Sequence, residues 1–211
     1  SPIMGAYLNN VNNDPVAPNE NFARELLQLF SIGTCELNQD GSLRGGICQA
    51  TYDNDTVRSY AYALTGWTFP PGGRSPWGCG SSGVNCRYYK GNMVPVAARH
   101  NSNELGLLSG VGLDPGHTAR QALEAVLDSL MNHPNIGPFV GGHLIQQLVS
   151  SNPSPAYVAR VAQAFQTGRF RGFGLGRPGD MKATVAAILL DPEARTESPS
   201  AQAGRLREPV Q

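Results

Sequence analysis

Residues 18–33, PNENFARELLQLFSIG, constrain the fold most strongly, because this segment carries both the start and the stop signals of a helix. Pro18 suits the first helical turn, where its missing N–H is not needed, and Gly33 suits the left-handed position just past the end. With about 100° of rotation per residue, the apolar side chains fall on one arc, which predicts a core face. That arc contains Phe22, Ala23, Leu26, Leu27, Leu29 and Phe30.

The other face of this predicted helix is densely polar. Glu20 and Arg24 are four residues apart, and so are Asn21 and Glu25. Residues at this spacing are neighbours on a helix surface, so we expect Glu20 and Arg24 to pair. An acidic residue near the positive end of a helix is also favoured by the helix dipole. The spacing alone therefore favours a face exposed to water over a functional site.

Six further segments have helical periodicity or capping signals. Asp53 and Asp180 precede two of them as N-cap residues, and the Ser154-Pro155 pair opens a third. The segments are residues 2–10, 54–66, 117–132, 138–150 and 181–190, and a helix that begins at Pro155. The sequence therefore predicts an all-α fold, an irregular bundle of six or seven helices. At 211 residues, one domain spanning residues 1–211 is expected.

Two long loops, residues 34–51 and 68–102, interrupt the predicted helices, and each contains a local couple of cysteines. The couples are Cys35 with Cys48 and Cys79 with Cys86. We expect local disulfides because each couple brackets a turn-rich loop, whereas a zinc ribbon would need close CxxC knuckles, which the sequence lacks. Disulfide-pinned loops indicate an oxidising location, periplasmic or extracellular. Within the first loop, Asp40-Gly41 predicts a hairpin turn.

Charge and hydropathy exclude two kinds of partner. Lys plus Arg and Asp plus Glu both total 16, so no basic surface for nucleic acid is expected. The longest strongly apolar run, residues 183–190, is far shorter than the roughly 20 residues that span a bilayer. No cofactor is predicted, although the oxygen-rich turns are compatible with a structural calcium ion. The sequence leaves the identity of any metal and the oligomeric state open.

Several blocks of the chain resemble a large bacterial family, in the same order along the sequence. They are PNENFARELLQLFSIG, YDNDTVRSYAYALTGWTF, HPNIGPFVGGHLIQQLVSSNPSPAYVARVAQAF and GDMKATVAAILLDPEAR. The family is called domain of unknown function 1800, and its members are usually longer than this chain and typically exported. The resemblance implies that the chain is the later part of a longer exported protein. The resemblance does not indicate a particular reaction.

The resemblance also selects candidate site residues. The PNEN-ARE-L block is the hallmark of the family, which makes its polar residues functional candidates: Asn19, Glu20, Asn21, Arg24 and Glu25. Members often carry a His-Asp pair where this chain has His100 followed by Asn101. The Asn weakens a His-Asp couple as an oriented base or a metal-ligand pair, but His100 stays a candidate.

Two functions fit these residues. The first is an enzyme that acts on an extracellular polymer, such as a glycan, with Glu20 or Glu25 as general acid or base. Because these two glutamates point about 140° apart on the helix, His100 or another acid is expected as the partner. Trp67 is a candidate for stacking on a sugar ring.

The alternative is a structural or protein-interaction module without catalysis. In that case Asn19 and Asn21 hold loop backbone, and Arg24 and Glu25 pair with their neighbours in a buried network. The surroundings of the carboxylates discriminate between the two functions. A cleft that contains loose, unequal carboxylates favours the enzyme, and a fully paired interior network favours the module.

Overall fold

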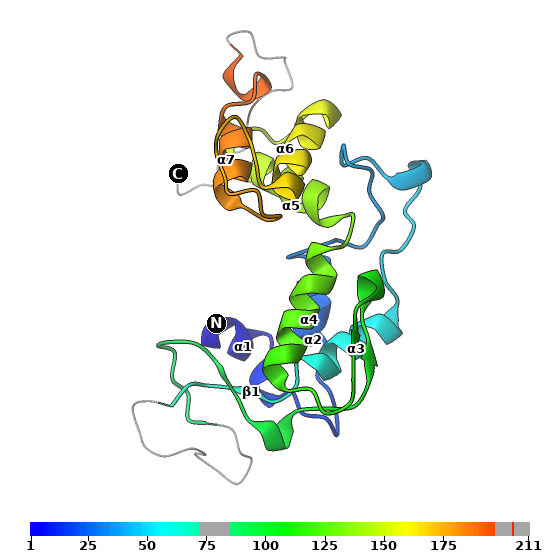
Figure 1. Ribbon diagram of the computed structural model, residues 1–211, viewed down its shortest axis with the longest axis vertical. Helices are drawn as coiled ribbons and strands as arrows, with labels where there is room; N and C mark the ends of the chain where they lie inside the picture. The colour runs from blue at the N-terminus through cyan, green and yellow to red at the C-terminus, as the bar shows by residue number, and fades with distance from the viewer. Residues whose placement is uncertain (72–84, 197–203, 205–211) are drawn as a thin grey trace. The chain divides into compact units, whose positions relative to one another are not determined.

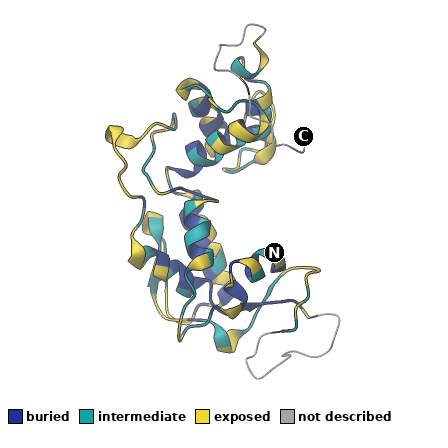
Figure 2. Ribbon diagram, turned by 180° about the vertical axis from the view of Figure 1, so that it is seen from behind, coloured by how far each residue is buried: buried dark blue, intermediate teal, exposed yellow. Residues whose placement is uncertain are grey.

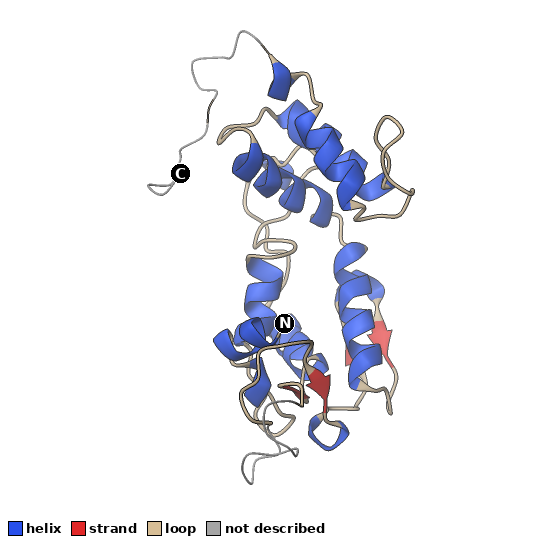
Figure 3. Cartoon of the chain, turned by 90° about the vertical axis from the view of Figure 1, so that its left-hand side faces the viewer, coloured by secondary structure: helices blue, strands red, loops and turns tan. Residues whose placement is uncertain are grey.

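The fold is mostly helical. The computed structural model describes residues 1–71, 85–196 and 204, and these residues contain seven α-helices and four two-residue strands (Figures 1 and 3). The helices are α1 (Pro2–Tyr7), α2 (Asn21–Gln28), α3 (Asn54–Ala63), α4 (Ala119–Met131), α5 (Ile136–Leu148), α6 (Pro155–Thr167) and α7 (Met181–Leu189). The sequence predicted an all-α fold of six or seven helices. The mainly helical content and the seven helices of the described residues confirm this part of the prediction, whereas the four short strands were not predicted.

Short elements connect the helices. The strands form two antiparallel pairs, β1 (Trp67–Thr68) with β2 (Val94–Pro95), and β3 (Leu105–Gly106) with β4 (Gly112–Leu113). Five 3-10 turns cover Asn10–Asn12, Arg44–Gly46, Ala97–Arg99, Leu108–Gly110 and Glu193–Arg195. None of the helices in the described part of the chain is long and apolar enough to cross a membrane.

The chain divides into two compact units, each made of two stretches of sequence. Unit one comprises Ser1–Leu29 and Tyr52–Asn132, and unit two comprises Phe30–Thr51 and His133–Gln211. Each is described by itself below. The single domain expected from the sequence stays a prediction.

In unit one, α3 packs against both α2 and α4 (Figure 1). Tyr60 on α3 is fully buried, and its hydroxyl lies 2.6 Å from the hydroxyl of Ser129 on α4. Val57 and Val126 are also fully buried on these two helices. Figure 2 shows buried and exposed positions alternating around the helices, as amphipathic sequences require.

In unit two, α6 packs against α5 and α7. The core cluster contains Ile145, Tyr157, Val158, Val161, Ala164, Ala187 and Ile188. The buried Tyr157 hydroxyl donates a 2.6 Å hydrogen bond to the carbonyl oxygen of Ile188, which ties α6 to α7. Gly141 allows α5 to approach α6 closely, since a Cβ there would lie only 3.1 Å from a methyl carbon of Val161.

Side-chain caps set the starts of four helices. Asp53, Ser154 and Asp180 each accept a hydrogen bond from a backbone N–H in the first turn of α3, α6 and α7, as the sequence predicted. Thr118 and Gln121 form a reciprocal capping box at the start of α4. These caps stop the helices from extending toward the N-terminus.

The helix predicted over residues 18–33 is shorter in the structure. It begins at Asn21, because the Asn19 side chain accepts a 3.1 Å hydrogen bond from the Asn21 N–H and holds the preceding chain in a turn. It ends at Gln28, so the prediction that Leu29 and Phe30 belong to the core is wrong: they are 55% and 57% exposed. The left-handed conformation predicted for Gly33 is confirmed, with φ of 72°.

The two predicted loop excursions differ in what the structure describes. Residues 34–51 form the expected hairpin, with bridges between Cys35 and Ala50 and between Leu37 and Leu43, closed by the Cys35–Cys48 disulfide. In the second excursion, Cys79 lies outside the described residues. The predicted pairing of Cys79 with Cys86 therefore stays a prediction.

Candidate functional site

The polar head of α2 forms an ion-pair network around Glu20 in unit one. Arg24 donates to Glu20 Oε2 at 3.0 Å, and the Nε atom of Arg58 lies 3.7 Å from Glu20 Oε1. Arg24 also reaches the side-chain oxygen of Asn54 at 3.4 Å. The Arg24 and Arg58 side chains are 40% and 61% exposed, so each ion pair contributes at most about 1 kcal/mol. Both oxygens of Glu20 are thus engaged by arginine.

Glu25, on the same helix, has different surroundings. Its Oε2 atom is buried and has no hydrogen-bond partner among the described residues. A buried polar atom left unpaired costs roughly 1–3 kcal/mol, so such atoms are rare in native proteins and call for an explanation. The two glutamates of the hallmark segment are therefore unequal.

Tyr52 lies within electrostatic range of Glu25 and Arg24. Burial raises the pKa of the Tyr52 phenol, the Arg24 charge lowers it and the Glu25 charge raises it. The phenol is therefore neutral near pH 7 and able to donate a hydrogen bond. Tyr52 was not among the site residues predicted from the sequence, because Tyr52 and α2 lie in different segments of the chain.

Asn13 and Asn19 form hydrogen bonds that hold the backbone before α2. The Asn19 N–H donates to the Asn13 side-chain oxygen at 2.7 Å, and the fully buried Asn13 amide donates to the Ala61 carbonyl at 2.8 Å. Asn21 is exposed at the first position of α2. This part of the hallmark segment attaches the start of α2 to α3.

His100 lies elsewhere in unit one. Its Nδ1–H donates to the Thr65 carbonyl at 3.1 Å, and its ring packs against His117 with 5.2 Å between ring centroids. No hydrogen bond or ion pair among the described residues joins His100 to Glu20 or Glu25. The structure therefore brings Glu20, Arg24 and Glu25 together on α2 but gives His100 a different set of neighbours.

Asn101, which follows His100, holds the loop. Its N–H donates to the Thr65 hydroxyl at 2.8 Å, and its side-chain oxygen accepts from the Asn103 N–H at 3.4 Å. Thus Thr65, not residue 101, orients the His100 ring.

Trp67 occupies β1 opposite Pro95 and is only 8% exposed. Its indole therefore packs within unit one. The predicted stacking of Trp67 on a sugar ring stays a prediction.

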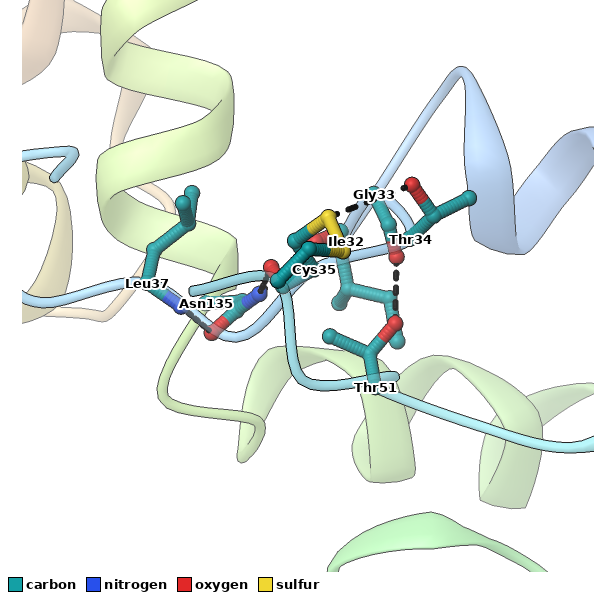
Figure 4. Close-up of a disulfide and its surroundings, with 8 residues drawn as sticks. Ile32, Gly33, Thr34, Cys35, Leu37, Thr51 and Asn135 are labelled. Carbon is teal, nitrogen blue, oxygen red and sulfur yellow. Dashed lines mark hydrogen bonds between the residues drawn. A yellow bond between two sulfur atoms is a disulfide. The ribbon is translucent and has the colours of Figure 1, made fainter. Parts of the chain in front are cut away.

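In unit two, Asn135 holds the disulfide loop (Figure 4). Its side chain is 1% exposed; it donates to the Ile32 and Cys35 carbonyls at 3.0 and 2.8 Å and accepts from the Leu37 N–H at 3.0 Å. On the other side of the loop, Thr51 donates to the Gly33 carbonyl at 2.5 Å. These bonds fix both ends of the hairpin.

An open pocket of about 420 Å³ lies between this hairpin and α5. Its lining includes Asp40 and Ser42 from the hairpin and Phe139, His143 and Gln146 from α5. The Phe139 and His143 rings are 4.3 Å apart between centroids. The Ser42 hydroxyl, which donates to Asp40 at 2.6 Å, and the Ser42 N–H lower the pKa of that carboxyl. The pocket thus combines aromatic rings with an ionised carboxylate.

A comparison with models of protein families shows which family the chain belongs to. The family described as "Protein of unknown function (DUF1800)" matches residues 1–211, the whole chain. The chain belongs to the DUF1800 family. No curated protein and no solved structure matches it significantly.

In this DUF1800 chain, sequence reasoning located the hallmark carboxylates, Arg24 and His100, but not the residues from other segments that the fold brings next to them. Tyr52 and Asn135 lie within two of the blocks that resemble the family, but no spacing rule links either residue to the groups near it in the fold. His117 is the first residue of the segment 117–132 that was predicted to be helical, and nothing in its spacing links it to His100.

Proposed function

We propose that this DUF1800 protein is an exported enzyme that acts on an extracellular polymer, such as a glycan, with Glu25 as its general acid or base. One observation carries the proposal: Glu20 is held by two arginines, whereas Glu25 keeps a buried oxygen without a partner. Two carboxylates in unlike surroundings are the arrangement that separates acid and base roles.

The unpaired oxygen of Glu25 would be satisfied by a donor on the substrate. When ionised, Glu25 accepts a hydrogen bond from a substrate hydroxyl or an attacking water; when protonated, it donates to a leaving-group oxygen. Tyr52, neutral and close by, is suited to donate a hydrogen bond to the same substrate. Arg24 and Arg58, which pair with Glu20, would also donate hydrogen bonds to polar groups of the polymer.

Export is supported by the Cys35–Cys48 disulfide, because disulfides persist in oxidising compartments. A periplasmic or extracellular location would also put the protein where polymers are encountered. Alkylation of free thiols in intact source cells tests this. Complete protection of Cys35 and Cys48 is expected, and rapid labelling of both would contradict export.

Activity is tested on purified protein with peptidoglycan, chitin, cellulose, starch and pectin, by measuring the release of reducing ends. We expect cleavage of at least one polymer, and a loss of rate of roughly 10²-fold or more in Glu25→Gln. Glu124→Gln, an exposed position on α4, is the matched control and should keep full activity. Full activity of Glu25→Gln on a polymer that the wild type cleaves would remove Glu25 from the mechanism.

A second candidate function, a non-catalytic module that binds a polymer or a partner protein, is favoured by the pocket of unit two. Its aromatic and polar lining is typical of ligand pockets. In that case the protein binds one of the polymers without cleaving it, and Phe139→Ala abolishes binding. Phe173→Ala, at a residue that is 37% exposed outside the pocket, should leave binding unchanged.

A further inference from the structure

Unit one contains a second buried polar centre, formed by His100 and His117. The Nε2 atoms of both rings are buried and have no hydrogen-bond partner among the described residues. His117 is only 9% exposed, and the two rings lie 5.2 Å apart between centroids at an interplanar angle of 79°. Two unpaired, buried nitrogens thus belong to two rings that pack against each other.

The hydrogen bonds of the opposite ring nitrogens determine the tautomers. His100 Nδ1 lies 3.1 Å from the Thr65 carbonyl oxygen, and His117 Nδ1 lies 2.8 Å from the Asp114 carbonyl oxygen. A carbonyl oxygen only accepts, so in both rings the proton is on Nδ1. Each Nε2 therefore carries a free lone pair and requires a donor or a cation.

This arrangement is the one that orients histidines as metal ligands. Metal-ligating histidines almost always donate their other ring N–H to a carbonyl or carboxylate oxygen, which fixes the tautomer and the ring orientation. Here both donations are to backbone carbonyls, and both remaining nitrogens are unpaired.

The backbone around His100 is built to hold the ring in place. Thr65 is fully buried and bonds to His100 through its carbonyl and to the Asn101 N–H through its hydroxyl, at 3.1 and 2.8 Å. Gly66 has φ of 81°, and a Cβ there would lie 3.0 Å from the backbone nitrogen of His100. The chain approaches His100 as closely as a glycine allows.

We propose that His100 and His117 bind one transition-metal ion of the imidazole-preferring class, zinc or copper, through their Nε2 atoms. Two nitrogens each about 2.0–2.1 Å from one ion lie roughly 3–4 Å apart, which is compatible with rings 5.2 Å apart between centroids. Imidazole suits zinc and copper, and copper(II) binds most tightly among the divalent ions of this series.

The remaining coordination positions are open to water or a ligand. No group of three or more His, Cys, Asp or Glu side chains able to hold a metal occurs within residues 1–71 and 85–196. Two protein ligands leave two positions of a tetrahedral ion free, one more than in a catalytic zinc site with three protein ligands. This site is independent of Glu25, and neither inference depends on the other.

The test is titration of the full, chelator-stripped chain with Zn²⁺ alone and Cu²⁺ alone, followed by calorimetry. Saturation at one metal ion per chain is expected for at least one of the two ions. His100→Ala and His117→Ala should each weaken binding by at least the roughly 10–100-fold typical of changes around metal ligands. His143→Ala, at an exposed histidine of unit two, is the control and should bind as the wild type does. No stoichiometric binding by the wild type, or unchanged binding in both unit-one variants, would overturn the proposal.

A spectroscopic measurement on the wild type decides the matter even if the variants fail to fold. Long-range ¹H–¹⁵N spectra should show His100 and His117 protonated on Nδ1. Added Zn²⁺ should shift the Nε2 resonances of these two residues and leave those of His133 and His143 in place. A proton on Nε2 of either ring, or Zn²⁺ shifts confined to the other histidines, would overturn the proposal.

Discussion

The Asn135 side chain donates a 2.8 Å hydrogen bond to the Cys35 carbonyl oxygen, although the two residues are 100 positions apart in the sequence. The same side chain pairs with Ile32 and Leu37. One buried amide therefore satisfies three backbone groups of the disulfide hairpin. Because that hairpin lines the pocket of unit two, Asn135 also determines the shape of the pocket rim.

Replacing Asn135 by Ala should be strongly destabilising. The substitution leaves the Ile32 and Cys35 carbonyls and the Leu37 N–H without their partner, and each unpaired buried group costs roughly 1–3 kcal/mol. Partial access of water to the hairpin lowers the sum, so we expect a loss of about 2–4 kcal/mol in the free energy of unfolding, measured with urea. Asn38→Ala, in the exposed part of the same hairpin, should cost less than about 1 kcal/mol. Equal losses in the two variants would contradict this role.

The Cys35–Cys48 disulfide should contribute about 3 kcal/mol to stability, as expected in the chain-entropy model for a loop of about this length, here 13 residues of sequence separation. The double variant Cys35→Ser/Cys48→Ser removes the cross-link while keeping side chains of similar size. Its urea midpoint should fall, and a reducing agent should lower the wild-type midpoint by at least the same amount, because it would also break the predicted Cys79–Cys86 disulfide. A wild-type midpoint unchanged by reduction would show that the hairpin is held by Asn135 and Thr51 alone.

Local signals predicted the helices well, and long-range contacts explain what was missed. Asp53, Ser154 and Asp180 act within their own first turns, so their effect could be read from adjacent residues. The start of α2 depends on Asn13 and Asn19, which form hydrogen bonds outside the helical repeat. Periodicity could not detect these bonds, and it extended the helix at both ends.

The same distinction applies to the candidate site. The pairing of Glu20 with Arg24 follows from a spacing of four residues and was predicted. The packing of His100 against His117, and the position of Tyr52 near Glu25, join separate elements through the tertiary fold. No spacing rule in a single sequence reports such proximity.

Acid should destabilise the protein partly through Asp53. The Thr56 N–H and hydroxyl, both 2.8 Å from Asp53 Oδ1, lower the pKa of this carboxyl below its ordinary value of 3.8. A carboxyl with a lowered folded-state pKa contributes stability that is fully present above about pH 4 and is lost as the pH falls through the folded-state value. The Tm should therefore fall more steeply below pH 4 in the wild type than in Asp53→Ser.

Serine is the informative replacement at this position, because it still caps α3 but does not titrate. Asp53→Ala should lower the Tm at every pH, since it removes the cap itself. Identical acid profiles of the wild type and Asp53→Ser would show that the Asp53 charge does not contribute.

Glu25→Met tests whether the unpaired carboxylate is retained for function at the expense of stability. Methionine keeps the length and the helix propensity of the side chain but removes a buried oxygen without a partner. Because such an atom costs roughly 1–3 kcal/mol, Glu25→Met should raise the free energy of unfolding by about 1 kcal/mol after some repacking.

Glu20→Met is the matched control on the same helix. It loses the contacts with Arg24 and Arg58 and should lower the free energy of unfolding by up to about 1 kcal/mol. Residues at active sites are often suboptimal for stability, so opposite signs for the two variants, measured by urea unfolding at pH 7, support a functional Glu25. If Glu25→Met is instead the more destabilising of the two, Glu25 is a paired structural residue and the carboxylate mechanism loses its basis.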